Sequence, residues 1–330
     1  MQPIVKHVLL TLKHLVWISV LAAGSAFTLA SDRYQTLQIG AGGMLGNYFH
    51  SAFTLCNLIN RDITTNHIAC HARITAGSAE NINGLRSGRF QLAIAQSDAV
   101  IAATNGATYF EDANPYDGLR LVQVLYPEVF TVLVRQDSSY STFSDLRNKR
   151  VNAGDTESGI YLATQSIVNA LNWSLRDKAS FTNYLPSEQL AALCNNQIDA
   201  AVMVIGHPVE QLNDSLIGCP IRWIGFTDQD IETITQVSPF YTTVTVPEGI
   251  YSFDSPAKNT LGINAILVAD SKTPDKLVFN IVTMIDQSLE TMQQLAPVFN
   301  MTTRETLRPI NQPGLPPLHN GALNFYQSTQ

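Results

Sequence analysis

The sequence predicts an α/β protein of about two domains, in which mainly parallel sheets are flanked by helices. Short apolar segments typical of buried strands alternate with stretches whose apolar residues recur at helical spacing. The chain has 330 residues, which corresponds to about two domains of roughly 150 residues each. Hydrophobic residues make up 45% of the composition and charged residues 14%, and this balance excludes a disordered chain.

The first half of the chain supplies strands and helices in alternation. A strand at 37–39 runs into a glycine-rich turn, and a helix follows in which Phe49, Phe53, Cys56 and Ile59 share one face. The next expected elements are a strand at 68–74, a helix around Ile82 closed by Gly88, a strand at 92–95 and a helix that begins at 96–98.

The second half begins with two strands, at 121–125 and 130–134, that flank the segment Tyr126-Pro127-Glu128. The remaining expected elements are a helical turn at 144–146, a strand around Val151, a helix after Gly159, strands at 199–204, 242–246 and 263–269, and mostly helix over 277–299. A proline-rich tail follows and is expected to wrap the surface.

Residues 1–30 have the pattern of a secretory signal peptide. Lys6 and Lys13 precede an apolar run at 15–23, and small residues lead to Ala30. The run is shorter than the ~20 residues of a spanning helix, although an uncleaved anchor and cleavage after Ala26 stay open. Cleavage after Ala30 leaves 18 basic against 27 acidic residues, a formal charge of −9. We therefore expect a periplasmic protein, and its acidic surface does not attract nucleic acid.

Four cysteines in an exported chain predict disulfide bonds. Of the three possible connectivities, the simplest joins Cys56 to Cys70 and Cys194 to Cys219. His67 and His71 flank Cys70 and offer a zinc site as the alternative. No second close-set pair completes a tetrahedral set, so we expect no metal.

Five loops follow predicted strands and are rich in glycine, serine, threonine, asparagine and glutamine. They lie at 42–48, 76–81, 96–98, 156–159 and 204–208. Ligands of open α/β sheets bind at such loops, whose backbone N–H groups suit an anion. The alternative is that each loop only supplies turn and cap chemistry.

Catalytic and nucleotide-binding motifs are incomplete. Gly40, Gly42 and Gly46 resemble a dinucleotide fingerprint with one extra residue, but no acidic ribose ligand is well placed, so we expect no cofactor. Ser78 lacks the complete nucleophile elbow, and His207 has no evident nucleophile partner. We assign no catalytic residue, and we expect His207 to cap or line a pocket.

Several blocks, taken in order, resemble the TAXI-type solute-binding proteins of tripartite ATP-independent periplasmic (TRAP) transporters. The blocks are 40–48, 75–82, 95–98, 125–128, 149–152 with 158–159, 197–200, 206–208 and 317–322. The similarity covers nearly all of residues 36–326. Asn47, Phe49 and His50 replace the small, Tyr and Pro residues expected after the glycine loop, and Ala76 replaces a Gly.

This resemblance implies a two-lobed, periplasmic-binding-protein-like (type II) fold. Lobe 1 would comprise 31–125 plus 243–330, and lobe 2 would comprise 126–242. The lobes would close on a small organic anion, such as a dicarboxylate, a keto acid, glutamate or 2-oxoglutarate, and deliver it to TRAP-type permease subunits. We expect a monomer that is not an enzyme. The alternatives are an exported two-lobed enzyme acting on a small carboxylate and a surface protein with a vestigial pocket.

In this interpretation a ligand carboxylate lies on the N–H groups of 43–47, at the N-terminus of the helix that begins near Tyr48. The residues expected to bind ligand are Gly43, Gly46, Asn47, Tyr48, Ser78, Asn81, Gln96, Ser97, Tyr126, Ser158, Gly159, Gly206 and His207.

Overall fold

The computed structural model describes most of the chain after residue 33. The described residues are 34–62, 64, 67–106, 110, 114–174, 176–178, 180–185, 187–207, 209, 212, 219–246, 248–249, 257–300, 302–309 and 314–329. The expected signal peptide lies outside these residues. Among the described residues, no helix has both the length and the apolar character that crossing a membrane requires.

Lobe 1 is built on three neighbouring strands at one end of a nine-stranded sheet. These strands are β1 (Gln35–Gly40), β2 (Ile68–Arg73) and β3 (Leu92–Gln96). Its helices are α2 (Asn47–Arg61), α4 (Ser78–Arg86), α5 (Ser97–Thr104), α10 (Asp275–Gln287), α11 (Leu289–Leu295) and α12 (Asn320–Ser328), with a 3-10 turn, η2 (Pro297–Phe299). The expectation of a proline-rich surface tail missed α12, which buries Ala322 and Phe325 against α10.

Lobe 2 occupies the other end of the sheet. Its strands are β5 (Val151–Asn152), β6 (Ala200–Ile205), β7 (Ile221–Ile224) and β8 (Thr242–Val246). Its helices are α6 (Gly159–Ala170), α7 (Gln189–Cys194) and α9 (Asp228–Val237), with the 3-10 turn η1 (Phe143–Leu146). The predictions missed α7, α9 and β7, of which α7 has 6 residues and β7 has 4.

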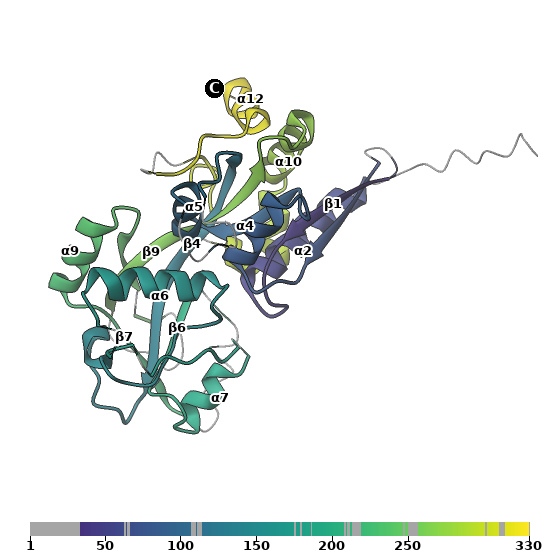
Figure 1. Cartoon of the computed structure of the whole chain (residues 1–330). Coiled ribbons are helices and arrows are strands. Elements are labelled where there is room, and N and C mark those ends of the chain that lie inside the picture. The colour runs from purple at the N-terminus through teal and green to yellow at the C-terminus, as the bar shows by residue number, and fades with distance from the viewer. Residues whose placement is uncertain are drawn as a thin grey trace, which may run out of the picture.

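Two long strands join the lobes, β4 (Leu119–Arg135) and β9 (Lys258–Asp270). The strand order is β2-β1-β3-β9-β4-β6-β5, and Figure 1 shows β4 and β9 running through the middle of the molecule into both lobes. The prediction of two separate strands flanking Tyr126-Pro127-Glu128 was wrong, because β4 continues through this segment. Pro127 pairs with Asn264, and register shifts between Leu121 and Gln123 and between Val124 and Tyr126 absorb the irregularity.

The sheet is mixed, although the α/β class and the flanking helices are as predicted. β1 pairs in parallel with β2 and β3, and β5 pairs in parallel with β6. The remaining pairings are antiparallel, and each of them involves β4 or β9. The antiparallel share therefore comes from the two strands that carry the chain between the lobes.

The core packing changes along β9. Ala265, Leu267 and Ala269 belong to a core cluster of lobe 1, whereas Leu261 and Ile263 pack in a cluster of lobe 2 with Phe130 and other residues. β8 also pairs with the first half of β9. We propose that the second crossing between the lobes lies just after Ile263, whereas the sequence suggested residue 243.

Both predicted disulfide bonds are present. Cys56 bonds to Cys70 with a Cα–Cα distance of 4.9 Å, and Cys194 bonds to Cys219 at 5.6 Å. The first bond attaches the edge strand β2 to α2, and Asn60 adds side-chain hydrogen bonds to the backbone N–H and carbonyl of Cys70. Because the Cys70 sulfur is bonded to Cys56, it is not available as a ligand of the alternative zinc site.

One predicted helix face was partly wrong. In α2 the buried face includes Ala52, Leu55 and Cys56, whereas Phe53 is 53% exposed and stacks on Phe49. The apolar spacing correctly predicted the helix and the burial of Cys56 and Ile59, but it wrongly placed Phe53 on the buried face.

Candidate functional site

A cavity of about 210 Å³ lies between the two lobes at the loops predicted from the sequence. Lobe 1 contributes the glycine-rich loop after β1, the loop before α4 and the end of β3. Lobe 2 contributes the loop before α6 and the end of β6. The predicted site residues that line the cavity are Gly43, Gly46, Asn47, Tyr48, Ser78, Gln96, Ser158 and Gly159.

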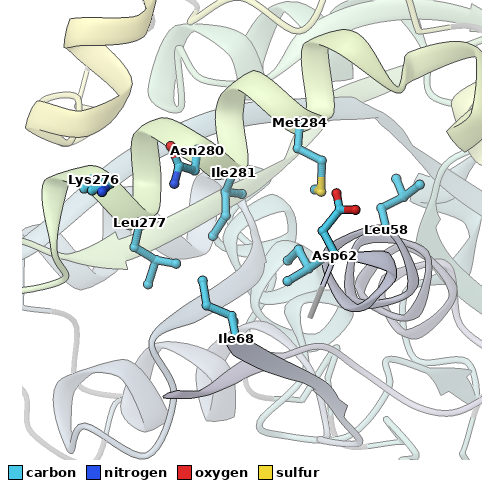
Figure 2. Close-up of a pocket in the computed structure, with 9 residues that line it drawn as sticks. Leu58, Asp62, Ile68, Lys276, Leu277, Asn280, Ile281 and Met284 are labelled. Carbon is cyan, nitrogen blue, oxygen red and sulfur yellow. The ribbon is translucent and has the colours of Figure 1, made fainter. Parts of the chain in front are cut away.

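A larger groove of about 460 Å³ lies at the opposite end of α2. Figure 2 shows that Leu58 of α2, Asp62 at the C-cap of α2, Ile68 of β2 and Met284 of α10 surround it. None of the predicted site residues lines this groove. The two cavities are therefore separated by most of a 15-residue helix, a length of about 20 Å.

Four helices from both lobes begin at the inter-lobe cavity. Their N-cap residues are Gly46 of α2, Gly77 of α4, Gln96 of α5 and Ser158 of α6, and all four line the cavity. The caps of α2, α4 and α5 make no side-chain hydrogen bond to their helices. Each helix N-terminus carries the equivalent of about half a positive charge. The cavity therefore collects positive potential from backbone groups, which suits an anion.

Two buried amide side chains in the cavity wall have an atom without a hydrogen-bond partner. Gln96 is 3% exposed and its Oε1 is unpaired, and Gln189 is 1% exposed and its Nε2 is unpaired. The Oε1 of Gln189 accepts a hydrogen bond of 3.0 Å from Asn152 Nδ2, which leaves the Gln189 amino group for another acceptor. Unpaired buried polar atoms are costly, so these amides indicate a site that a polar molecule completes.

Glu128 is the one carboxyl group in the described cavity lining that is deeply buried, with 2% exposure. The Tyr48 hydroxyl donates to its Oε2 at 2.7 Å. Burial raises the pKa of Glu128 to about 8, and the nearby Asp98 adds to the increase. Burial and the Glu128 charge also raise the pKa of Tyr48, so this hydroxyl stays protonated. At neutral pH the side chain of Glu128 is therefore mainly the neutral acid.

Asn81 and Ser97 lie in the scaffold behind the cavity. The Asn81 amide donates to the carbonyls of Ala41 and Ile94, so it ties together the ends of β1 and β3. Ser97 is buried, and its Oγ accepts a hydrogen bond of 3.3 Å from the N–H of Asn264. The structure does not bring these two predicted residues to the cavity surface.

Tyr126, Gly206 and His207 also lie behind the lining residues. Tyr126 is 1% exposed and packs edge-on against Phe299. His207 Nε2 shares a hydrogen bond of 2.8 Å with Thr131 Oγ1, and burial lowers the pKa of His207 to about 4. His207 is therefore neutral at pH 7, and its contacts position it as a packed residue under the cavity.

Direct contacts join the lobes on both sides of the cavity. Asn47 donates its side-chain amide to the carbonyl of Gly206 at 3.0 Å, and the N–H of Ala79 donates to the carbonyl of Glu157 at 3.2 Å. Gly159 packs so tightly on lobe 1 that a Cβ there would lie 2.3 Å from Gln96 Oε1. The structure is therefore a closed arrangement of the two lobes.

Sequence reasoning missed Glu128 and Gln189. Glu128 lay between two expected strands, and the signal that identifies it is that it is the one acidic residue of β4. Gln189 begins α7 and lies where no loop motif points to it. Their place in the cavity depends on pairing and packing between segments that are distant in sequence.

The similarity to known proteins matches this architecture. A model of the NMT1-like family matches residues 39–328, which is most of the chain. The chain belongs to the NMT1-like family. The match includes every loop that lines the inter-lobe cavity of this NMT1-like chain.

Solved structures with a similar fold include MatC from Rhodopseudomonas palustris with bound malate. Its TM-score is 0.56 at 12% identity, over 88% of the NMT1-like chain and 95% of MatC. The periplasmic binding protein BugD has a TM-score of 0.52 at 11% identity, over 80% and 86% of the two chains. XAC2383 from Xanthomonas citri, bound to chloride ion, has a TM-score of 0.52 at 12% identity, over 89% and 98%. The fold is thus periplasmic-binding-protein-like.

Proposed function

We propose that this chain is a periplasmic solute receptor that binds a small organic anion between its lobes. The observation that carries the proposal is the convergence of four helix N-termini, from both lobes, on one cavity. A carboxylate placed there accepts hydrogen bonds from backbone N–H groups and is stabilised by the helix dipoles. The unpaired amide of Gln189 supplies a further donor from lobe 2.

Binding is coupled to closure of the lobes. A ligand shifts an equilibrium between open and closed forms only if it binds the closed form more tightly. Donors at Asn47 and Ser78 belong to lobe 1, whereas Ser158 and Gln189 belong to lobe 2. A molecule that contacts both sets is bound fully only in the closed form, so the ligand favours closure.

The ligand class that we propose comprises dicarboxylates, keto acids and acidic amino acids. Two solved structures support an anion: MatC holds malate and XAC2383 holds a chloride ion. The sequence blocks that resemble TAXI proteins support delivery to TRAP-type permease subunits by a monomeric receptor that is exported through residues 1–30. The description of BugD as a periplasmic binding protein supports the compartment.

The experiment that tests the proposal is a ligand screen on the purified mature chain. Dicarboxylates, keto acids and amino acids are screened by thermal shift, and each hit is measured by titration calorimetry. We expect a hit to bind one molecule per chain and to be recovered unchanged by mass spectrometry. Recovery of a chemically altered product would instead indicate an enzyme, and the absence of any carboxylate hit would contradict the proposal.

A further inference from the structure

The inter-lobe cavity contains a buried acidic side chain, Glu128, in addition to the helix N-termini. Glu128 lies on β4, one of the two strands that join the lobes, and faces the cavity with its Oε2 bonded to the Tyr48 hydroxyl. Asp155, the other acidic residue of the lining, lies nearer to solvent, and its Oδ1 accepts from the N–H of Glu157. Glu128 is therefore the buried acidic group that a ligand meets.

The described ionisable side chains around Glu128 are acidic or phenolic, and none is a cation. The described residues that line the cavity include no Lys, Arg or His. The groups that face Glu128 are the hydroxyl of Tyr48 from α2, Tyr126 on its own strand, and Asp98 of α5. Asp98 is itself bonded to the hydroxyl of Tyr241 at 2.9 Å. No protein cation among these groups neutralises the carboxylate, so ionised Glu128 needs a cation from elsewhere.

We propose that Glu128 recognises an ammonium group of the ligand, so that the preferred solute is an α-amino acid rather than the matching keto or hydroxy acid. The inference rests on the proposed function. The carboxylate of the amino acid lies at the helix N-termini, and its ammonium group donates to Glu128. The zwitterion thus places its carboxylate at the helix N-termini and its ammonium group at Glu128 at the same time. An ammonium–carboxylate hydrogen bond is charge-assisted and stronger than the bond that a hydroxyl or carbonyl group makes.

Recognition of this kind moves one proton. The empty receptor at pH 7 holds Glu128 mainly as the neutral acid, because burial raises its pKa to about 8. The arriving ammonium group keeps its own protons and stabilises the carboxylate, so the acidic proton of Glu128 passes to solvent. A ligand with a second carboxylate in the same place leaves Glu128 protonated and releases no proton.

The decisive measurement is calorimetric proton counting on the wild-type protein at pH 7. Each amino acid is compared with a partner that lacks the ammonium group: L-glutamate with 2-oxoglutarate, L-aspartate with L-malate, and L-alanine with L-lactate. Titration in buffers of different ionisation enthalpy gives the number of protons released. We expect about one proton per bound amino acid and a preference of about 100-fold over the matched acid.

Variants test the assignment to this side chain. In Glu128→Gln we expect loss of the amino-acid preference and of the proton release, with binding of the matched acids retained. Glu290→Gln, at an exposed position of α11 outside the cavity lining, is the matched control and keeps both properties. If Glu128→Gln does not fold, the proton count on the wild type decides.

The failures of the two proposals are distinguishable. Equal or tighter binding of the keto or hydroxy acids without proton release would overturn the role of Glu128 and leave the anion receptor in place. Absence of binding by every carboxylate would overturn the proposed function itself.

Discussion

The side-chain amide of Asn47 donates a 3.0 Å hydrogen bond to the backbone carbonyl of Gly206, across 159 residues of sequence and from one lobe to the other. Asn47 is the first residue of α2, and Gly206 follows β6. A Cβ at Gly206 would lie 2.6 Å from Val298 Cγ2, so the carbonyl is presented by a backbone with no room for a side chain. The bond therefore stabilises the closed form directly, beside the cavity.

Replacing Asn47 by alanine removes this bond between the lobes. We expect Asn47→Ala to populate the open form and to weaken ligand binding about fivefold, because a hydrogen bond contributes about 1 kcal/mol. Small-angle X-ray scattering with and without ligand measures the open fraction. Asn57→Ala, at an exposed position of the same helix, serves as the control. An unchanged scattering profile and affinity in Asn47→Ala would show that the bond does not contribute to closure.

Gly159→Ala tests the fit of the lobes at the other side of the cavity. The new Cβ would lie 2.3 Å from Gln96 Oε1 and 2.7 Å from Ser78 Oγ. We expect the lobes to stop short of closure and the affinity to fall by about 100-fold, since contacts from lobe 2 are then lost. The melting temperature without ligand should change little, because each lobe keeps its own core. Full affinity in the variant would contradict the closed-cleft model of binding.

Gln96→Ala tests the unpaired amide in the cavity wall. We expect roughly tenfold weaker ligand binding, as for the loss of one hydrogen bond to a charged group. The protein should stay folded, because the backbone N–H of Gln96 still donates to Ser78 Oγ. Calorimetry measures the affinity, and Gln165→Ala on α6 is the control. Wild-type affinity in a well-folded Gln96→Ala protein would remove Gln96 from the binding site.

Glu128 makes stability depend on pH in a direction that can be stated in advance. Its folded pKa, about 8, lies above the ordinary value of 4.5, so the folded state holds the extra proton and loses stability as pH rises through 8. We expect a loss of about 1 kcal/mol between pH 7 and 8.5, measured by urea unfolding without ligand.

The matched protein for this measurement is Glu128→Gln, which should lack the loss. The window above pH 7 avoids His207 and His319, whose lowered pKa values give the opposite slope at lower pH. Identical slopes in the two proteins would show that Glu128 does not titrate in this range.

Local signals predicted the part of the site that local chemistry determines. The loops before α2, α4 and α6 were identifiable because glycine, serine and asparagine mark helix N-termini whatever the rest of the chain does. Both disulfides followed from the spacing of the cysteines. The α/β class followed from the alternation of strands and helices.

Local signals did not predict how deeply a side chain is buried or which distant strands pair. Tyr126 and His207 lie in cavity-forming segments but point into the core, because their neighbours Phe299 and Trp223 come from distant segments. The sequence indicated two strands separated by a segment that contains Pro127, yet the pairing of β4 with β9 holds the chain extended there. The role of Glu128 depends on this same pairing, which explains why sequence reasoning missed the residue.

The position of β9 has a consequence for how the chain folds. β9 lies between β3 and β4 and pairs with both, although it comes at 258–270, after most of the chain. Until it is synthesised, β3 and β4 each have an unpaired edge, which is a template for wrong pairing and aggregation. Neither lobe can complete its sheet early, so the two lobes are expected to fold together, late and slowly, under the control of contacts distant in sequence.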